Sequence, residues 1–328
     1  MKLQVPFIQL PLAFDAGALA AEIAALGEAP WRPHPQGFPG NSMLPLVAVN
    51  GDPANEAFAG PMRPTPELLH CPYLTQVIAS LGVTAGRSRL MRLSGMAEVT
   101  RHADQGYYWA ERVRVHVPVV TQPTVRFECG DAAINMAAGE CWIFDTWRQH
   151  RVLNDAVEER VHLVVDTVGG GAFWDLVGRG RPHDGPRAGW QQHAVPVQPG
   201  VVATFACESV NVPAVMSPWE LSGHLGLLLA DAVPHPNLPQ VRQIATRFAR
   251  HWQGLWFEHG EREEGRPAFR EVLERFMEEV RVPSQPLMLR NELRWYTVLT
   301  ALVGKVALGG VASQPATAAA QRDVGDNG

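Results

Sequence analysis

Hydrophobic and polar residues follow three different patterns along the chain. In residues 1–100, apolar positions recur at helical spacing after Asp15, a suitable N-cap, and again over 66–81, where Pro66 fits the first turn of a helix. The intervening segment 38–64 is rich in Gly, Pro and Asn, and it predicts a loop with a short strand at 44–49. This part of the chain is therefore expected to be mixed α/β structure.

Between residues 88 and 167 the period changes to two. In 113–119, valines alternate with Arg114, His116 and Pro118, and 161–167 repeats this alternation. Each segment is predicted to be a strand with one apolar and one polar face. Glycine-containing turns separate several such short strands, an arrangement that favours a jelly-roll sandwich or barrel.

After residue 169 the pattern becomes a Gly/Pro-rich connector and then helical. Apolar residues line one helix face over 241–256 and another over 269–280, and a third helix is predicted for 291–306. The last residues are small and polar, which is typical of disorder.

These patterns predict an α+β fold. We expect a double-stranded β-helix (jelly-roll) domain with N-terminal helices over 1–175 and a connector over 176–210. A helical C-terminal region over 211–310 and a disordered tail over 311–328 complete the prediction.

Composition narrows the class of protein. The 328 residues carry a net charge of −5, which argues against nucleic-acid or anionic-membrane partners. No run of apolar residues is long enough for a membrane span, and residues 1–6 do not resemble a signal peptide. Four cysteines without metal-binding spacing are expected to be reduced thiols. A cytoplasmic protein is therefore expected.

One combination of residues suggests chemistry. His102, Asp104 and His150 form the ligand set of the 2-His-1-carboxylate facial triad, which holds Fe(II) and leaves coordination positions open. His102 and Asp104 are two apart, so both side chains point the same way on an extended strand. Arg160 follows His150 by ten residues, and an arginine there suits an anionic cosubstrate held by its carboxylate.

Each of these residues also has a simpler interpretation. A His-x-Asp pattern occurs often by chance, and His150 fits a solvated loop. If Arg160 points inward, a buried and unpaired guanidinium would be costly, so it implies a carboxylate partner. That partner is either a ligand or a nearby acid, namely Glu158, Glu159 or Asp166. Arg114 and His116 have two interpretations. They contact the cosubstrate or substrate, or they lie on the solvated face of an edge strand.

Taken in order, these motifs resemble the aspartyl/asparaginyl β-hydroxylase family of Fe(II)/2-oxoglutarate-dependent oxygenases over roughly residues 85–170. The matching segments are 101–104, 114–118, 139–145, His150 and 160–166. Asp104 makes the chain more similar to bacterial members, including free-proline hydroxylases, because animal members lack the carboxylate ligand.

The resemblance implies a double-stranded β-helix core with His102, Asp104 and His150 as iron ligands. It also implies that Arg160 binds the distal carboxylate of 2-oxoglutarate, with Arg114 or His116 helping. The expected activity is a dioxygenase that uses O₂ to hydroxylate an unactivated C–H of an amino acid or peptidyl residue, releasing succinate and CO₂.

Two other functions remain open at this point. A zinc-dependent hydrolase could use the same three ligands and an activated water, and a jelly-roll binding protein could carry the motif incidentally. The expected partner is a small-molecule or peptide substrate. The C-terminal helices are expected to complete the fold or to form a homodimer interface.

Overall fold

The computed structural model describes residues 1–35 and 37–309, which form two compact units. Of the described residues, the first unit comprises Met1–Asp104 and Glu111–Ser209, and the second comprises Gln105–Ala110 and residues 210–309. The tail predicted to be disordered, 311–328, lies outside the described residues. Each unit is described here by itself.

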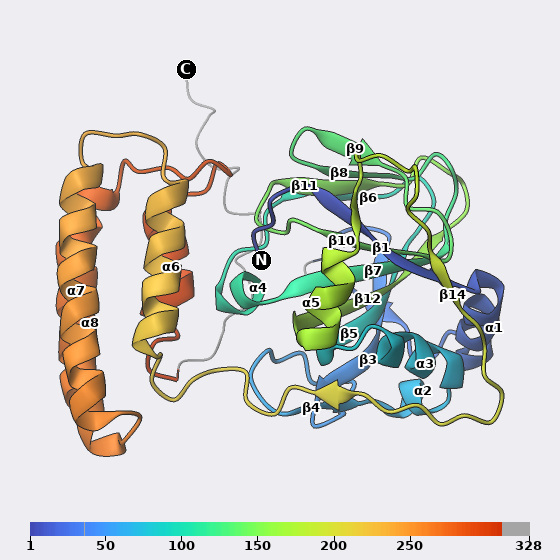
Figure 1. Cartoon of the computed structure of the whole chain (residues 1–328), viewed down its shortest axis with the longest axis horizontal. Coiled ribbons are helices and arrows are strands. Elements are labelled where there is room, and N and C mark those ends of the chain that lie inside the picture. Colours follow the sequence, from blue (N-terminus) through green and yellow to red (C-terminus); the bar gives the residue numbers. More distant parts are fainter. Residues whose placement is uncertain (36, 310–328) are drawn as a thin grey trace. The chain divides into compact units, whose positions relative to one another are not determined.

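The first unit contains an eleven-stranded sheet and a four-stranded sheet (Figure 1). The large sheet has the order β13 (Arg181–Pro182), β1 (Phe7–Phe14), β10 (Glu140–Phe144), β7 (Val113–Val120), β12 (Arg160–Gly169), β5 (Thr84–Leu93), β3 (Asn41–Val49) and β2 (Arg32–Pro33). Three short strands extend it: β14 (His193–Val195) on β1, β15 (Ala206–Cys207) on β5, and β4 (Met62–Pro64) on β3. The small sheet has the order β6 (Glu98–His102), β11 (His150–Leu153), β8 (Arg126–Cys129) and β9 (Ala132–Ile134). The predicted α+β jelly roll is confirmed.

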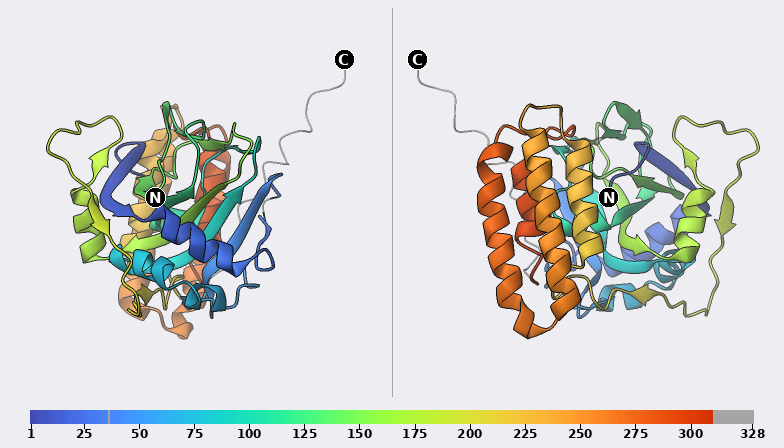
Figure 2. Two further views of the ribbon diagram at one scale, coloured as in Figure 1. Left: turned by 90° about the vertical axis from the view of Figure 1, so that its right-hand side faces the viewer. Right: turned by 60° about the vertical axis from the view of Figure 1, so that its left-hand side comes forward.

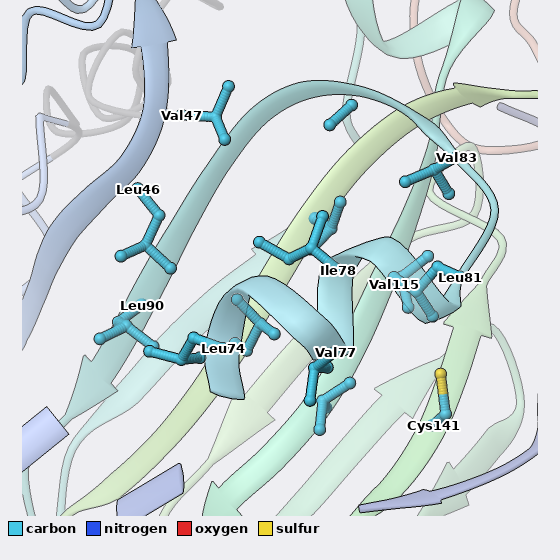
Figure 3. Close-up of a cluster of buried hydrophobic side chains, with 14 of the residues drawn as sticks. Leu46, Val47, Leu74, Val77, Ile78, Leu81, Val83, Leu90, Val115 and Cys141 are labelled. Atoms are coloured by element: carbon cyan, nitrogen blue, oxygen red, sulfur yellow. The ribbon is translucent and has the colours of Figure 1, made fainter. Parts of the chain in front are cut away.

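One face of the large sheet is covered by helices. These are α1 (Ala16–Leu26), α2 (Pro66–Leu69), α3 (Pro72–Ser80) and α5 (Gly171–Gly178). Figure 3 shows Leu74, Val77 and Ile78 of α3 lying over Leu90 and Val115 of the sheet. The apolar side chains of β7 and β12 belong to this buried cluster, so burial of that face against helices stabilises the unit.

The opposite, inner face of the large sheet faces the small sheet. A second buried cluster there includes Phe7, Phe127 and Phe144, contributed by both sheets. Because strand residues alternate between faces, the polar residues of β7 and β12 point to this side. The predicted period-two strands are thus confirmed, and their polar faces line the space between the sheets rather than bulk solvent.

The helix predicted for 66–81 is divided in two. It ends at Leu69 and restarts at Pro72, with Cys71 in a non-helical conformation between them. Pro72 has no N–H to donate and disfavours a helical residue before it. The prediction of a continuous helix was wrong for this reason.

The second unit is helical. Its helices are α6 (Pro218–Asp231), α7 (Leu238–His259), α8 (Arg266–Ser284) and α9 (Trp295–Leu299), with a short 3₁₀ turn at Glu263–Gly265 and a π-helical turn at Thr300–Gly304. Helix α4 (Tyr107–Glu111) starts in this unit and ends in the first. Figure 2 shows α7 and α8 side by side, and the rings of Phe248 and Phe276 stack between them at 3.9 Å. The two predicted helix faces therefore pack against each other.

Two helical details differ from the prediction. The third helix begins at Trp295 rather than at residue 291, because Glu292 adopts a positive φ of 70° in a turn that is closed by the Leu289 N–H and the Leu293 carbonyl. Helix α6 was not predicted, although Ser217 accepts a capping hydrogen bond from the Glu220 N–H and Pro218 occupies the first turn.

The segment expected to be a connector, 176–210, contributes β13, β14 and β15 to the large sheet. The four cysteines form no disulfide within the part of the chain that the structure describes. Among the described helices, none is long and apolar enough to cross a membrane.

Candidate active site

The two candidate histidine ligands lie opposite each other on neighbouring strands. His102 ends β6 and pairs in register with His150, which begins β11. Their ring centroids are 4.3 Å apart. Asp104 follows two residues after His102, and one ligand atom from each of the three residues lies within 4.8 Å of the others. The structure thus brings together the three residues that were singled out in the sequence.

Hydrogen bonds orient both imidazoles in the same way. The Nδ1 of His102 lies 2.7 Å from the Thr100 carbonyl oxygen, and the Nδ1 of His150 lies 2.9 Å from the Arg148 carbonyl oxygen. Because a carbonyl only accepts, each Nδ1 donates, and each Nε2 lone pair is left for a metal. Burial, reinforced by His102, lowers the pKa of His150 to about 3. His150 is therefore neutral, as a metal ligand must be.

Asp104 is a buried carboxylate held by its neighbours. Its backbone N–H donates to the Thr146 carbonyl oxygen at 3.0 Å, and its Oδ2 lies 3.1 Å from a guanidinium nitrogen of Arg114. Burial raises the pKa of the carboxyl, but the surrounding positive groups, with Arg114 first among them, outweigh burial and lower the pKa below its usual value. An ionised oxygen is therefore available beside the two Nε2 atoms.

Arg114 bridges two carboxylates. Its Nε donates to Oδ1 of Asp166 at 3.0 Å while Nη1 contacts Asp104, and strand pairing sets Asp166 directly opposite Arg114. Strand β7 lies inside the sheet, so the edge-strand alternative for Arg114 and His116 is wrong. With these contacts Arg114 supports the candidate ligand Asp104; its expected contact with the cosubstrate stays a prediction.

Replacing Arg114 with methionine tests this support. We expect the affinity for Fe(II) to fall by about 10–100-fold, the range for losing a residue that orients a metal ligand. Arg114→Lys should retain part of the affinity, because a lysine restores the charge but not the two-sided contact. Isothermal titration under anaerobic conditions measures both variants. Unchanged affinity in Arg114→Met would contradict a positioning role.

Arg160 is buried, with 4% of its surface exposed, and it has no carboxylate partner among the described residues. Its Nη2 lies 2.6 Å from Nδ1 of His162, and its Nε makes no hydrogen bond within the described part of the chain. Burial lowers the pKa of the guanidinium to about 9. The nearby acids considered as alternative partners, Glu158, Glu159 and Asp166, form no ion pair with it there.

The contacts of His162 and His116 determine where their protons lie. Because Arg160 can only donate, Nδ1 of His162 accepts, and this ring is neutral. Nδ1 of His116 lies 3.3 Å from the same atom and must donate to it. Burial and then Arg160 lower the pKa of both histidines well below the usual value. His116 is thus linked to Arg160 through His162, and its expected contact with the cosubstrate stays a prediction.

Sequence reasoning missed several residues on the same inner face. Arg87 and Arg89 of β5 are both buried, and Arg89 lies 3.6 Å from Oδ2 of Asp166. Two arginines spaced two apart on one strand were a usable signal. The rings of Phe127 and Phe144 lie edge-on to His116, at 5.3 Å and 5.4 Å. Their position could not be deduced without the pairing of the two sheets.

The fold and the site together define a class. A jelly roll with two imidazoles and a carboxylate converging from adjacent strand ends is the arrangement of mononuclear metal centres with open coordination positions. Residues 58–169 match the sequence model of the family described as Aspartyl/Asparaginyl beta-hydroxylase. For this segment the match confirms the family that the motifs indicated, and the family is one of hydroxylases.

Solved structures with similar folds share little sequence with the chain. An oxidoreductase of the 2OG-Fe(II) oxygenase family from Burkholderia pseudomallei is 15% identical over 52% of this chain and 89% of its own, with a TM-score of 0.38. A prolyl-4-hydroxylase from Pseudomonas putida is 16% identical over 51% and 95%, with a TM-score of 0.34. At these scores the likeness says nothing about activity. No curated protein matches the chain in sequence.

Proposed function

We propose that this protein is an Fe(II)- and 2-oxoglutarate-dependent dioxygenase. It hydroxylates an unactivated C–H bond of an amino acid, or of an amino-acid residue in a peptide, and releases succinate and CO₂. The family match supports a hydroxylase, and the arrangement of the triad supports a metal-dependent one. The observation that carries the proposal further is Arg160.

Arg160 is the feature that distinguishes a 2-oxoglutarate enzyme from other metal proteins. A buried guanidinium that contacts a neutral imidazole, and has no carboxylate partner within the described ranges, is costly unless a ligand brings the missing anion. Arg160 is the first residue of β12. Strand β12 pairs with β7, which pairs with β10, and the inner face of these strands faces the small sheet that carries His102 and His150. A dicarboxylate that chelates the metal at one end and meets Arg160 at the other satisfies this requirement.

The donor set fits Fe(II). Two neutral imidazole nitrogens and one ionised carboxylate, supplied by His102, His150 and Asp104, are the ligands that non-heme iron oxygenases use. When bound, the iron would supply the oxidising power to break a C–H bond, which amino-acid side chains lack.

The chain's own residues fix the metal ligands, orient the cosubstrate and exclude water. Arg114 fixes the Asp104 carboxylate, and the Thr100 and Arg148 carbonyls fix the two imidazoles. Arg160 orients the cosubstrate through a bidentate contact. The buried rings of Phe127 and Phe144 provide an apolar wall, so that electrostatic contacts inside the site are stronger than in water.

A zinc hydrolase would use the same three ligands but leaves Arg160 without a role. Under that alternative the guanidinium would remain buried with only a histidine contact among the described residues. In a non-catalytic protein, the tautomers of His102 and His150, which leave each Nε2 lone pair available for a metal, would have no role. Neither alternative accounts for the buried arginine.

Turnover of 2-oxoglutarate tests the proposal. The purified protein is incubated with Fe(II), ascorbate and 2-oxoglutarate in air, with panels of free amino acids and short peptides, and succinate is measured. We expect succinate to form with iron and to increase with particular members of the panel, while zinc-loaded protein gives none. If iron-loaded protein consumes no 2-oxoglutarate with or without the panel, the proposed function is wrong.

A further inference from the structure

A short turn, residues 145–149, carries the chain from β10 in the large sheet to β11 in the small sheet and ends directly before His150. Its first residue, Asp145, has none of its surface exposed. Asp145 also ends the segment 139–145 that carried part of the family resemblance, yet the proposed function gives its carboxylate no role. A buried carboxylate is costly unless its oxygens accept hydrogen bonds, so its contacts show what it holds in place.

Both carboxylate oxygens of Asp145 bind the turn that follows it. The Trp147 N–H donates to Oδ1 at 3.0 Å, and the Nε of Arg148 donates to Oδ2 at 3.0 Å. The backbone N–H of Arg148 donates to the Asp145 carbonyl oxygen at 3.2 Å. Local bonds of this kind let an aspartate impose a turn on the residues after it. Asp145 therefore fixes Arg148 through both its backbone and its side chain.

The first carbonyl of this turn that matters for the site belongs to Arg148. Its oxygen accepts from Nδ1 of His150 at 2.9 Å. The direction of this carbonyl depends on Asp145, which holds the N–H and the guanidinium of the same residue. If the carbonyl turned away, either ring nitrogen of His150 could carry the proton, and the Nε2 lone pair would be lost in part of the molecules.

A second carbonyl of the turn holds another candidate ligand. The Thr146 carbonyl oxygen accepts from the backbone N–H of Asp104 at 3.0 Å, and Thr146 lies between the two residues that the Oδ1 contact of Asp145 joins. His102, in contrast, is oriented by the Thr100 carbonyl of its own strand. The turn thus holds two of the three candidate ligands, which reach the site from different strands.

We propose that Asp145 is a positioning residue for two metal ligands at once. Through the Arg148 carbonyl it keeps His150 in the tautomer that presents Nε2, and through the Thr146 carbonyl it holds the backbone of Asp104. The inference rests on the proposed function in one respect, namely that His102, Asp104 and His150 bind the metal. Metal affinity then depends on a carboxylate that is not itself one of the three candidate ligands.

The tautomer of His150 in the metal-free protein gives the first test. Ring ¹⁵N shifts distinguish a protonated nitrogen from an unprotonated one, and the spectrum of His150→Gln identifies the signal. We expect the proton on Nδ1 in wild type and a mixture of tautomers in Asp145→Asn. This variant keeps an oxygen for the Trp147 N–H but loses the charge that holds Arg148. His102 is the internal reference, because its partner is the Thr100 carbonyl and its tautomer should not change.

Titration with Co(II), a divalent metal that binds the same kinds of ligand, gives the second test. We expect the affinity to fall about 10–100-fold in Asp145→Asn. Arg148→Met should show a smaller fall and a smaller tautomer change; its side chain is 39% exposed, so this variant carries the test if Asp145→Asn does not fold. Glu128→Gln is the matched control, because Glu128 binds Arg151, the residue after His150. It should behave as wild type.

Three results would overturn the positioning role. They are a wild type with the His150 proton on Nε2, a His150 tautomer that is unchanged in the folded variants, and a change at His102 as large as that at His150. The last would mean that the substitution loosens the small sheet as a whole. Failure of the proposed function is seen separately, as absent consumption of 2-oxoglutarate by wild type, and the tautomer measurement needs neither metal nor cosubstrate.

Discussion

Replacing Arg160 with methionine is expected to reduce the affinity for 2-oxoglutarate by two to four orders of magnitude while leaving iron binding intact. Two charge-assisted hydrogen bonds of about 1.5–3 kcal/mol each are lost, which corresponds to a factor on the order of 10²–10⁴. Arg160 is not among the three candidate ligands, so the Fe(II) affinity should not change. Titration of 2-oxoglutarate into anaerobic Fe(II) protein measures the first affinity, and anaerobic titration of Fe(II) into the metal-free protein measures the second.

The same substitution has an expected effect on stability that a purely structural arginine would not show. Because Arg160 has no carboxylate partner within residues 1–35 and 37–309, its replacement removes a buried charge rather than an ion pair. We expect the free energy of unfolding of the ligand-free protein to stay the same or to rise. Arg151→Met is the control: this arginine binds Glu128 on the small sheet and is 40% exposed. A clear loss of stability in Arg160→Met with unchanged 2-oxoglutarate affinity would contradict the assigned role.

Replacing Asp104 with alanine is expected to abolish stoichiometric iron binding and with it hydroxylase turnover. Loss of a group that merely orients a ligand costs about 10–100-fold in metal affinity, and loss of the anionic ligand itself should cost more. Arg114 keeps its contact with Asp166, so the fold should survive. Metal analysis after anaerobic loading, together with urea unfolding, measures binding and folding independently.

Asp155→Ala provides the comparison for Asp104→Ala. Its carboxylate pairs with Arg126 and is 51% exposed. Removing it therefore changes the net charge by the same amount as Asp104→Ala and leaves the candidate site unaltered. We expect this variant to bind iron and turn over like wild type. Full iron occupancy in Asp104→Ala would show that the triad is not the metal site.

The sequence sufficed for much of the site because the relevant side chains follow strand periodicity. His102 and Asp104 are two apart at a strand end, so they point to one side, and the alternation in 113–119 separates Arg114 and His116 from the valines. The pairing of His102 with His150 could not be deduced, because it depends on which strands of the small sheet are neighbours. A family resemblance supplied that connection.

Other features depend on register, which no local pattern reveals. Arg114 meets Asp166 because β7 and β12 pair in one particular alignment, and Arg89 comes near Asp166 through the irregular pairing of β5 with β12. The break at Pro72 was readable in the sequence and was overlooked. The arginines at 87 and 89 were overlooked because only their burial distinguishes them from a solvated strand face.

The most direct test of the central proposal is the visible charge-transfer band of the anaerobic Fe(II)–2-oxoglutarate complex. It should be measured for wild type, Asp104→Ala, Arg160→Met and Arg151→Met at the same concentrations. We predict a band in wild type and Arg151→Met, no band in Asp104→Ala, and a weak band in Arg160→Met that grows with 2-oxoglutarate. Iron-loaded wild type without a band would contradict the proposal that this protein is a 2-oxoglutarate-dependent dioxygenase.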